Sequence, residues 1–225
     1  MKLSFVLAES ALELVPKELW KAPAVASDSR RRGVDPSGIL LDRSFHHSAM
    51  SRLGEAEKRG RPDLVHATLL NVTGTPLYLD GKVDVFVHTC QDEVLALAEK
   101  TRIPKSYFRF RGLTEKLLRS GEGEGLVKVR HATVRELVRR TMIPGRVFGL
   151  SVQGRQTALE DLGAEAAGVE NPCVIVGGFP HGHFSRETLE VVDELDRIHD
   201  RPLEAHVVAA RVVYEIEKAS RRTNR

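Results

Sequence analysis

The chain contains 225 residues, of which 41% are hydrophobic and 29% charged, a composition typical of a globular protein with its own core. These values exclude wholesale disorder and a collagen-like chain. The two cysteines, Cys90 and Cys173, are too few for a disulfide scaffold and form no paired-cysteine motif. The 34 basic and 31 acidic side chains leave a net charge of +3, so a nucleic-acid partner would depend on how the positive charges are distributed.

No apolar run approaches the roughly 18 residues that a membrane span needs. The first apolar stretch is interrupted by Glu9 and Glu13, too early for a signal peptide. We therefore expect a soluble cytoplasmic protein that has no membrane partner.

Apolar periodicity and turn residues predict a mixture of short strands and helices in the first part of the chain. In order, these are a strand over 2–7, a helix over 11–21, an arginine-rich loop over 27–36, a buried strand over 38–42, helices over 46–58 and 63–71, a hairpin of strands over 82–89 and 93–98, a helix over 105–119 and a strand over 126–130. Pro62 suits the first turn of the helix that follows it.

Helices and strands alternate more regularly in the second part of the chain. The predicted elements are a helix over 133–140, a strand over 146–152, a helix over 157–166, a strand over 173–176, a helix over 186–194, a strand over 196–199 and a helix over 204–219. This alternation predicts an α/β fold with a largely parallel sheet and helices on both faces. The segment 77–130 breaks the rhythm, and we expect it to be an insertion in one domain over 1–225.

The glycine-rich sequence VIVGGFPHGHFS, residues 174–185, carries a strand into a turn ahead of a helix. In open α/β sheets, ligands bind outside the carboxyl ends of the strands, where glycines let them approach the backbone. The same glycines also fit a tight turn without a ligand. His181 and His183 have no third ligand nearby in sequence, so we expect no metal site.

A second candidate site is KRGRPDL, residues 58–64. Asp63 at the start of a helix is explained by the helix dipole alone. Alternatively, Arg59 and Arg61 hold a phosphate while Asp63 faces a base.

Basic and aromatic residues alternate in RIPKSYFRFR, residues 102–111. If Pro104 opens a helix, Arg102, Lys105 and Arg109 share or border one face. Positive charge interleaved with aromatic rings suits RNA, although a solvated helix face above core aromatics has the same pattern.

The segment LDRSFHHSAM, residues 41–50, places Asp42 at the end of a strand, followed by His46 and His47. Adjacent residues on a helix point about 100° apart, so at least one of these histidines is expected to be structural.

Taken together, the motifs LLDRSFHHSAM, KRGRPDLVH, TRIPKSYFRF, VIVGGFPHGHFS and PLEAHVVAARVVYE resemble, in order and spacing, the Emg/Nep family of small-subunit rRNA pseudouridine N1-methyltransferases. The resemblance runs from about Leu3 to Tyr214, and the compact chain is similar to archaeal members. It implies a SPOUT-type α/β fold with a C-terminal trefoil knot, a homodimer, and a cofactor-binding part at about 145–225. The implied partners are small-subunit rRNA and ribosomal assembly proteins.

The resemblance also implies that S-adenosylmethionine is the cofactor, and that no metal is required because the cofactor carries the reactive methyl. Backbone groups in three loops would hold the adenine edge between apolar walls. The implied cofactor-binding residues are Leu150, Val176, Gly177, Gly178, Gly182, Ile198, Leu203 and His206.

On the RNA side, the resemblance implies contacts by Arg61, Arg102, Lys105 and Arg109, with Lys105 where relatives carry arginine. Lysine keeps the charge but lacks the bidentate fork of arginine. Methylation requires the N1 proton of pseudouridine to leave, and Asp63 is the first candidate to accept it or to orient the ring. Asp42 is the second candidate. Asp63 has a structural alternative, in which it braces Arg61 or a dimer contact.

Two other functions share these features. A dimeric rRNA-binding assembly factor, whose methyl transfer is incidental, would need the same basic surface. A SPOUT enzyme acting on another RNA, such as a tRNA base, would need the same cofactor loops, although the RGRPD and RIPKSYFRF motifs argue against it through the resemblance.

Overall fold

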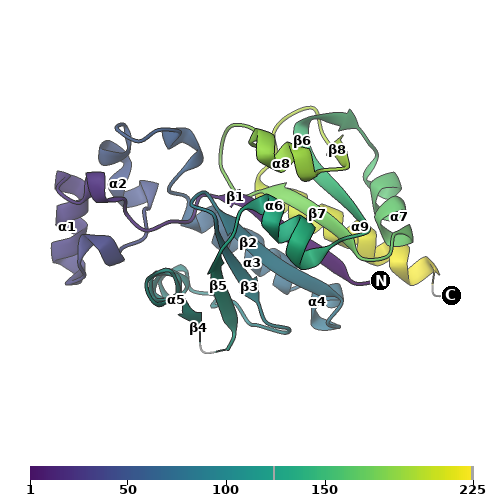
Figure 1. The fold of residues 1–225 in the computed structure, drawn as a ribbon, viewed down its shortest axis with the longest axis horizontal. Helices are drawn as coiled ribbons and strands as arrows, with labels where there is room; N and C mark the ends of the chain where they lie inside the picture. The colour runs from purple at the N-terminus through teal and green to yellow at the C-terminus, as the bar shows by residue number, and fades with distance from the viewer. Residues whose placement is uncertain (124, 224–225) are drawn as a thin grey trace.

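Eight strands form one sheet in the part of the chain that the computed structural model describes, residues 1–123 and 125–223 (Figure 1). Their order across the sheet is β4 (Glu122–Gly123), β5 (Val127–His131), β3 (Glu93–Leu97), β2 (Val83–Thr89), β1 (Leu3–Ser10), β7 (Pro172–Gly177), β6 (Arg146–Gln156) and β8 (Glu194–Arg197). The neighbouring strands β2, β1, β7, β6 and β8 are parallel to one another. At the other edge of the sheet, β3, β5 and β4 add an antiparallel extension.

The central strand is β1, which pairs with β2 on one side and β7 on the other. Side chains alternate between the faces of a strand. Accordingly, Phe5 and Leu7 enter one hydrophobic cluster, and Val6 and Ala8 enter another. Burial on both faces accounts for the apolar run from Phe5 to Ala8 in this strand.

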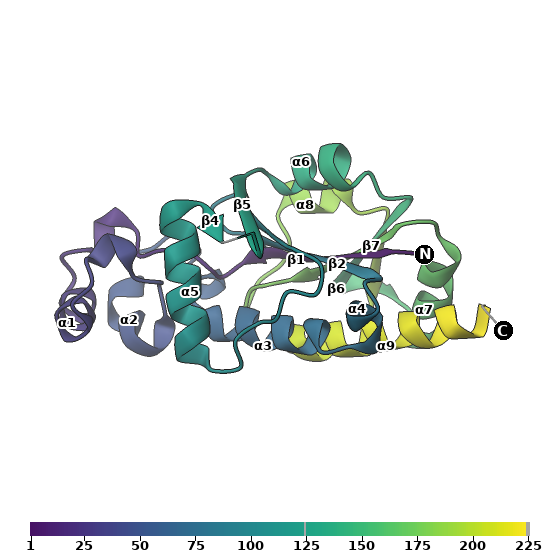
Figure 2. The ribbon, with the colours of Figure 1, turned by 90° about the horizontal axis from the view of Figure 1, so that it is seen from below.

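Helices cover both faces of the sheet, which confirms the predicted fold class (Figure 2). One face carries α3 (Pro62–Thr73), α4 (Pro76–Leu79), α5 (Tyr107–Ser120), α7 (Leu159–Gly168) and α9 (Ala205–Thr223). The other carries α6 (Val134–Glu136), the π-helical turn Leu137–Met142 and α8 (Arg186–Val191).

A lobe formed by α1 (Pro23–Arg32) and α2 (Arg43–Met50) projects from one end of the sheet (Figure 1). It has its own apolar cluster, which includes Val15, Leu19, Val25 and Met50. The predicted helix over 11–21 was wrong: this stretch is extended, with an isolated bridge from Leu14 to Leu40 and a short 3₁₀ turn. Pro16 interrupts the apolar periodicity, because proline lacks an amide donor and its ring clashes inside a helix.

Helix α1 was missed, since the arginine-rich stretch 27–36 was expected to be a loop. Its ends carry ordinary helix signals, Pro23 at the first position and Gly33 at φ +63° as the C-cap. The start of α5 was also misplaced, because that helix begins at Tyr107 rather than at Lys105.

Within the predicted insertion, 77–130, β2 still runs parallel to β1, so the antiparallel departure begins at β3. The single domain over 1–225, of which 124, 224 and 225 lie outside the described residues, stays a prediction, as does the trefoil knot. No described helix combines the length and apolar character that crossing a membrane requires.

Candidate active site

A cleft of about 240 Å³ lies at the carboxyl ends of β6, β7 and β8. Three segments enclose it: Leu150–Val152, where the pairing of β6 with β7 ends, the turn over 176–184, and the segment 196–203 that leads into α9. Carboxyl ends of parallel strands meet at one edge of a sheet, which explains why glycine turns distant in sequence form a single site.

The cleft offers apolar walls and free backbone donors. Among the eight residues predicted to bind the cofactor, those that line it are Leu150, Val176, Gly177, Gly182, Ile198 and Leu203. Within the described chain, the backbone N–H groups of Phe179 and of residues 181–184 donate to no other protein group. Such groups need partners from outside the protein. The lining therefore fits an adenosyl cofactor, with apolar surface for the base and backbone groups for its polar edge.

The other two predicted residues lie beside the cleft. Gly178 packs against β1: its N–H donates to the Ala8 carbonyl at 2.7 Å, and its own carbonyl accepts from Ala11 N–H at 2.8 Å. A Cβ at Gly178 would lie 2.2 Å from the Ser10 hydroxyl, so a glycine is required there for packing. His206 is half-buried in the first turn of α9 and is not part of the lining.

A close crossing at the floor of the cleft was not predicted. A Cβ at Gly154 would lie 2.6 Å from the backbone of Asp196, so glycine allows the end of β6 to pass directly over β8. The buried Asp196 carboxylate accepts a hydrogen bond from the Thr157 hydroxyl at 2.5 Å, which holds the crossing from the other side. Gly154 lies beyond the strand predicted over 146–152, and local spacing carried no signal for this contact.

Lys58 and Glu9 anchor the glycine turn. Gly182 has φ +102°, and a Cβ there would lie 2.9 Å from Cε of Lys58. The Lys58 ammonium lies 4.9 Å from the centroid of the Phe179 ring and donates to Glu9 Oε2 at 3.1 Å. One lysine thus contacts the turn at two positions.

Glu9 Oε1 accepts from Ser185 N–H at 2.7 Å and from the Thr188 hydroxyl at 2.6 Å. Burial raises the pKa of Glu9, but these hydrogen bonds and the charge of Lys58 lower it overall, below its usual range. This carboxylate therefore joins the end of β1 to α8 and to the cleft.

Arg61 and Asp63 form a bidentate ion pair at the start of α3, with Nε to Oδ1 at 2.8 Å and Nη2 to Oδ2 at 2.9 Å. Both side chains are partly exposed, 31% for Arg61 and 49% for Asp63. Asp63 raises the pKa of Arg61, and Glu204, next to Leu203 of the cleft, raises it further through space. Arg61 is therefore within electrostatic range of Glu204, the residue before α9.

Asp42, the second predicted catalytic carboxylate, is buried and caps α2. One oxygen accepts from Ser44 N–H at 2.8 Å, and the other accepts from the hydroxyl of Tyr107. Burial and then Asp42 raise the pKa of Tyr107. Both oxygens of Asp42 are used internally, which gives this residue a structural position rather than a reactive one.

Arg59 is also used internally. Its guanidinium donates to the buried Glu13 carboxylate at 2.7 and 2.5 Å, and only 14% of its side chain is exposed. The hydrogen bonds to Glu13 raise the pKa of Arg59. The structure therefore assigns Arg59 to an ion pair that holds the loop before α3, instead of to an RNA-facing surface.

The other three predicted RNA-binding cations, Arg102, Lys105 and Arg109, are exposed and have no ion-pair partner within the described chain. They do not share a helix face, because Arg102 and Lys105 lie in the loop ahead of α5. His66 holds this loop: its Nε2 donates to the Pro104 carbonyl at 2.7 Å, and its ring stacks on Phe110. Sequence reasoning missed His66.

His46 is fully buried, which confirms that at least one of the two adjacent histidines is structural. Its Nδ1 accepts from Asp42 N–H at 3.1 Å, and its Nε2 faces the buried Asp28 at 3.5 Å. Burial lowers the pKa of His46 despite the nearby carboxylates. We therefore assign it the neutral tautomer with its proton on Nε2.

Comparisons with known proteins agree with this geometry. The family model described as EMG1/NEP1 methyltransferase matches residues 5–217. A "Ribosomal RNA small subunit methyltransferase Nep1" of Pyrobaculum calidifontis is 41% identical over 219 residues, covering 95% of this chain and 97% of that protein. The protein of the same name from Staphylothermus marinus is 40% identical over 221 residues, covering 96% of this chain and 95% of its own length.

A solved structure, Archaeoglobus fulgidus Nep1 bound to S-adenosylhomocysteine, superimposes with a TM-score of 0.85 at 35% sequence identity. The match covers 97% of this chain and 99% of that one.

Proposed function

Because the chain belongs to the EMG1/NEP1 methyltransferase family, we propose that it transfers a methyl group from S-adenosylmethionine to N1 of a pseudouridine in a hairpin loop of small-subunit ribosomal RNA. The cleft at the ends of β6, β7 and β8 carries this proposal, since its apolar walls and free backbone donors suit an adenosyl group. Support also comes from the solved relative, which is bound to S-adenosylhomocysteine.

When bound, S-adenosylmethionine supplies an electrophilic methyl group, and no metal is needed for the transfer. The residues assigned to hold it are Leu150, Val176, Gly177, Gly182, Ile198 and Leu203. Lys58 and Glu9 keep the glycine turn in place, because they contact Phe179, Gly182 and the start of α8.

The acceptor explains the requirement for pseudouridine. Its ring N1 carries a hydrogen, whereas N1 of uridine is bonded to the sugar. The base must leave its stack and bring N1 to about 3–3.5 Å from the methyl group. Neither Asp63 nor Asp42 presents an oxygen free of internal hydrogen bonds. We therefore assign the N1 proton to solvent, and we give Asp63 the role of aiming Arg61.

RNA binding is assigned to Arg61, Arg102, Lys105 and Arg109, which are exposed or partly exposed on the side of α3 and α5. The three without partners are free to neutralise phosphates. Homodimerisation, contacts with ribosomal assembly proteins and a cytoplasmic location are further parts of the proposal. Tyr214, which is 58% exposed on α9, supports a protein contact on that helix.

The test uses labelled S-adenosylmethionine and a small-subunit rRNA fragment, with wild type and Gly177→Val. A Cβ at Gly177 would lie 2.9 Å from the Phe179 ring, so valine is expected to close the cleft. We expect wild type to label the fragment and Gly177→Val to lose more than 90% of the labelling, a tenfold loss that corresponds to about 1.4 kcal/mol. RNA binding should persist in the variant.

Absence of labelling by wild type, with tight RNA binding retained, would contradict the proposal and favour the assembly factor.

A further inference from the structure

The three aromatic residues at the start of α5 have different environments. Phe110 is buried and stacks on His66, with ring centroids 4.5 Å apart. Tyr107 is held by its hydroxyl, which donates to the buried Asp42. Phe108 is 67% exposed, although it lies between these two anchored rings in sequence. Core packing therefore accounts for Tyr107 and Phe110, but it does not account for Phe108.

Phe108 is the outer member of a ladder of alternating guanidinium groups and rings. Arg111 lies 5.3 Å from the Phe108 centroid and 5.5 Å from that of Phe45. Arg31, on α1, lies 5.0 Å from the Phe45 centroid. Among the described residues, none forms a hydrogen bond with the buried Nε of Arg111, so this guanidinium is held by the rings. The ladder runs from α1 through α2 to α5 and holds the Phe108 ring in one position.

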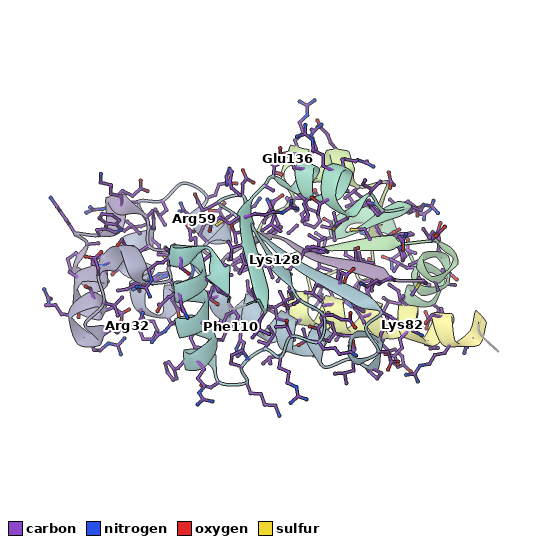
Figure 3. All side chains as sticks on the ribbon, turned by 60° about the horizontal axis from the view of Figure 1, so that its bottom comes forward. Arg32, Arg59, Lys82, Phe110, Lys128 and Glu136 are labelled. Carbon is purple, nitrogen blue, oxygen red and sulfur yellow. The ribbon has the colours of Figure 1, made fainter. Side chains whose placement is uncertain are left out.

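A bidentate ion pair keeps the two ends of this ladder together. Arg32 on α1 donates to the Glu115 carboxylate on α5 at 2.8 and 2.5 Å. Figure 3 labels Arg32 and, on α5, Phe110. Arg32 and Glu115 are largely buried, so this contact is little weakened by salt. A ring that projects from a fixed position loses little conformational entropy when a ligand stacks on it.

The surroundings of Phe108 are open and positively charged. Gly112 lies four residues further along the helix, and a Cβ there would meet no atom of the described part of the chain within 4 Å. Side chains four apart are neighbours on a helix, so the glycine leaves the ring uncovered on that side. The free cations Lys105 and Arg109 flank the ring in sequence.

We propose that Phe108 is a stacking platform for one unpaired base of the RNA, beside the phosphates that Lys105 and Arg109 neutralise. This inference rests on the proposed function and adds to it a contact with a base outside the cleft. An exposed aromatic ring amid free cations is the arrangement that binds single-stranded nucleic acid, because every base has a face that stacks. Arg111 beneath the ring extends the stack by one planar group.

The test measures binding of the pseudouridine-containing rRNA hairpin by wild type, Phe108→Ala, Phe108→Trp and Gly112→Met. We expect Phe108→Ala to weaken binding by about 5- to 100-fold without changing the salt dependence, since stacking is lost and no charge is removed. Phe108→Trp should bind at least as tightly as wild type. Methionine at position 112 should also weaken binding, because its side chain leans back over residue 108.

Leu79→Ala is the matched control, since Leu79 is 59% exposed at the end of α4, and it should bind like wild type. Replacing loop nucleotides one at a time by abasic ones identifies the base: at one position, Phe108→Ala should cause no further loss. Binding by Phe108→Ala within twofold of wild type, with methylation by wild type intact, would overturn the platform and leave the proposed function standing. Failure of wild type to bind the hairpin would overturn both, whereas binding without methylation would overturn the proposed function alone.

Discussion

Arg61 and Asp63 are two residues apart, and two parallel hydrogen bonds join the guanidinium to the carboxylate. A guanidinium held in this way has its remaining N–H groups directed by the carboxylate. The contribution of Asp63 to the reaction is therefore expected to act through Arg61.

A double-mutant cycle tests this coupling. We expect Arg61→Ala and Asp63→Asn each to weaken RNA binding, by about tenfold for Arg61→Ala. The double variant should bind RNA no more weakly than Arg61→Ala alone, because Asp63 has no guanidinium to hold once Arg61 is replaced. Affinity for S-adenosylhomocysteine should stay unchanged in all three. If Asp63→Asn slowed single-turnover methyl transfer further in the Arg61→Ala background, Asp63 would act on the base directly.

The sequence predicted which residue types matter at this scale, but not which of them are already occupied. Arg59 and Arg61 are indistinguishable in KRGRPDL, yet one reaches the buried Glu13 and the other remains at the surface. Asp42 is likewise occupied by Tyr107, 65 residues away. Partners this distant in sequence follow from tertiary packing, which local spacing does not encode.

At the scale of elements, Glu9 at the end of β1 fixes the glycine turn and the start of α8. Its folded-state pKa lies below the ordinary value, so its stabilising effect is present above about pH 4.3. That effect is lost as the pH falls through the folded-state pKa.

We expect Glu9→Gln to lower the free energy of unfolding by about 1–3 kcal/mol at pH 7, because charge-assisted hydrogen bonds are lost. The difference from wild type should shrink as the pH is lowered from 6 to 3. Urea unfolding across this range measures it. Glu57→Gln serves as the control, since Glu57 is exposed, and it should leave stability unchanged. A difference that is constant with pH would show that Glu9 acts by shape and not by charge.

The loop before α5 and the helix itself each present free cations. Arg102→Ala and Arg109→Ala should each reduce the slope of log affinity against log salt by about 0.7–0.9, the value for one phosphate contact. Lys82→Ala is the matched control, since Lys82 is exposed far from α5 (Figure 3), and its slope should equal that of wild type. Unchanged slopes for both arginine variants would place the RNA on another surface.

Elements with clear periodicity or turn residues were predicted well. The hairpin of β2 and β3, the strands β6 and β7, and the helices α3 and α9 all formed near their expected positions. The helix prediction over 11–21 was wrong because apolar residues of this stretch are buried in the lobe while the backbone stays extended. The prediction missed helix α1 for the opposite reason. The ends of this helix carry clear capping residues, but its polar sequence has only a weak apolar stripe.

At the scale of the whole molecule, the cleft depends on the order of strands across the sheet. β6 lies between β7 and β8, so segments near positions 150, 177 and 198 reach the same edge. The α/β class followed from the alternation of helices and strands, but strand order did not. The glycine motif therefore indicated a ligand site, and the other two walls of that site came only from the resemblance to a family.

The central claim is that the cleft and the basic surface act together on pseudouridine. The most direct measurement incubates the protein with labelled S-adenosylmethionine and two rRNA hairpins that differ only in having pseudouridine or uridine at one loop position. We predict transfer to the pseudouridine hairpin alone, because only that base carries a hydrogen on N1. Equal transfer to both hairpins would contradict this account, since the acceptor would then be an atom that the two bases share.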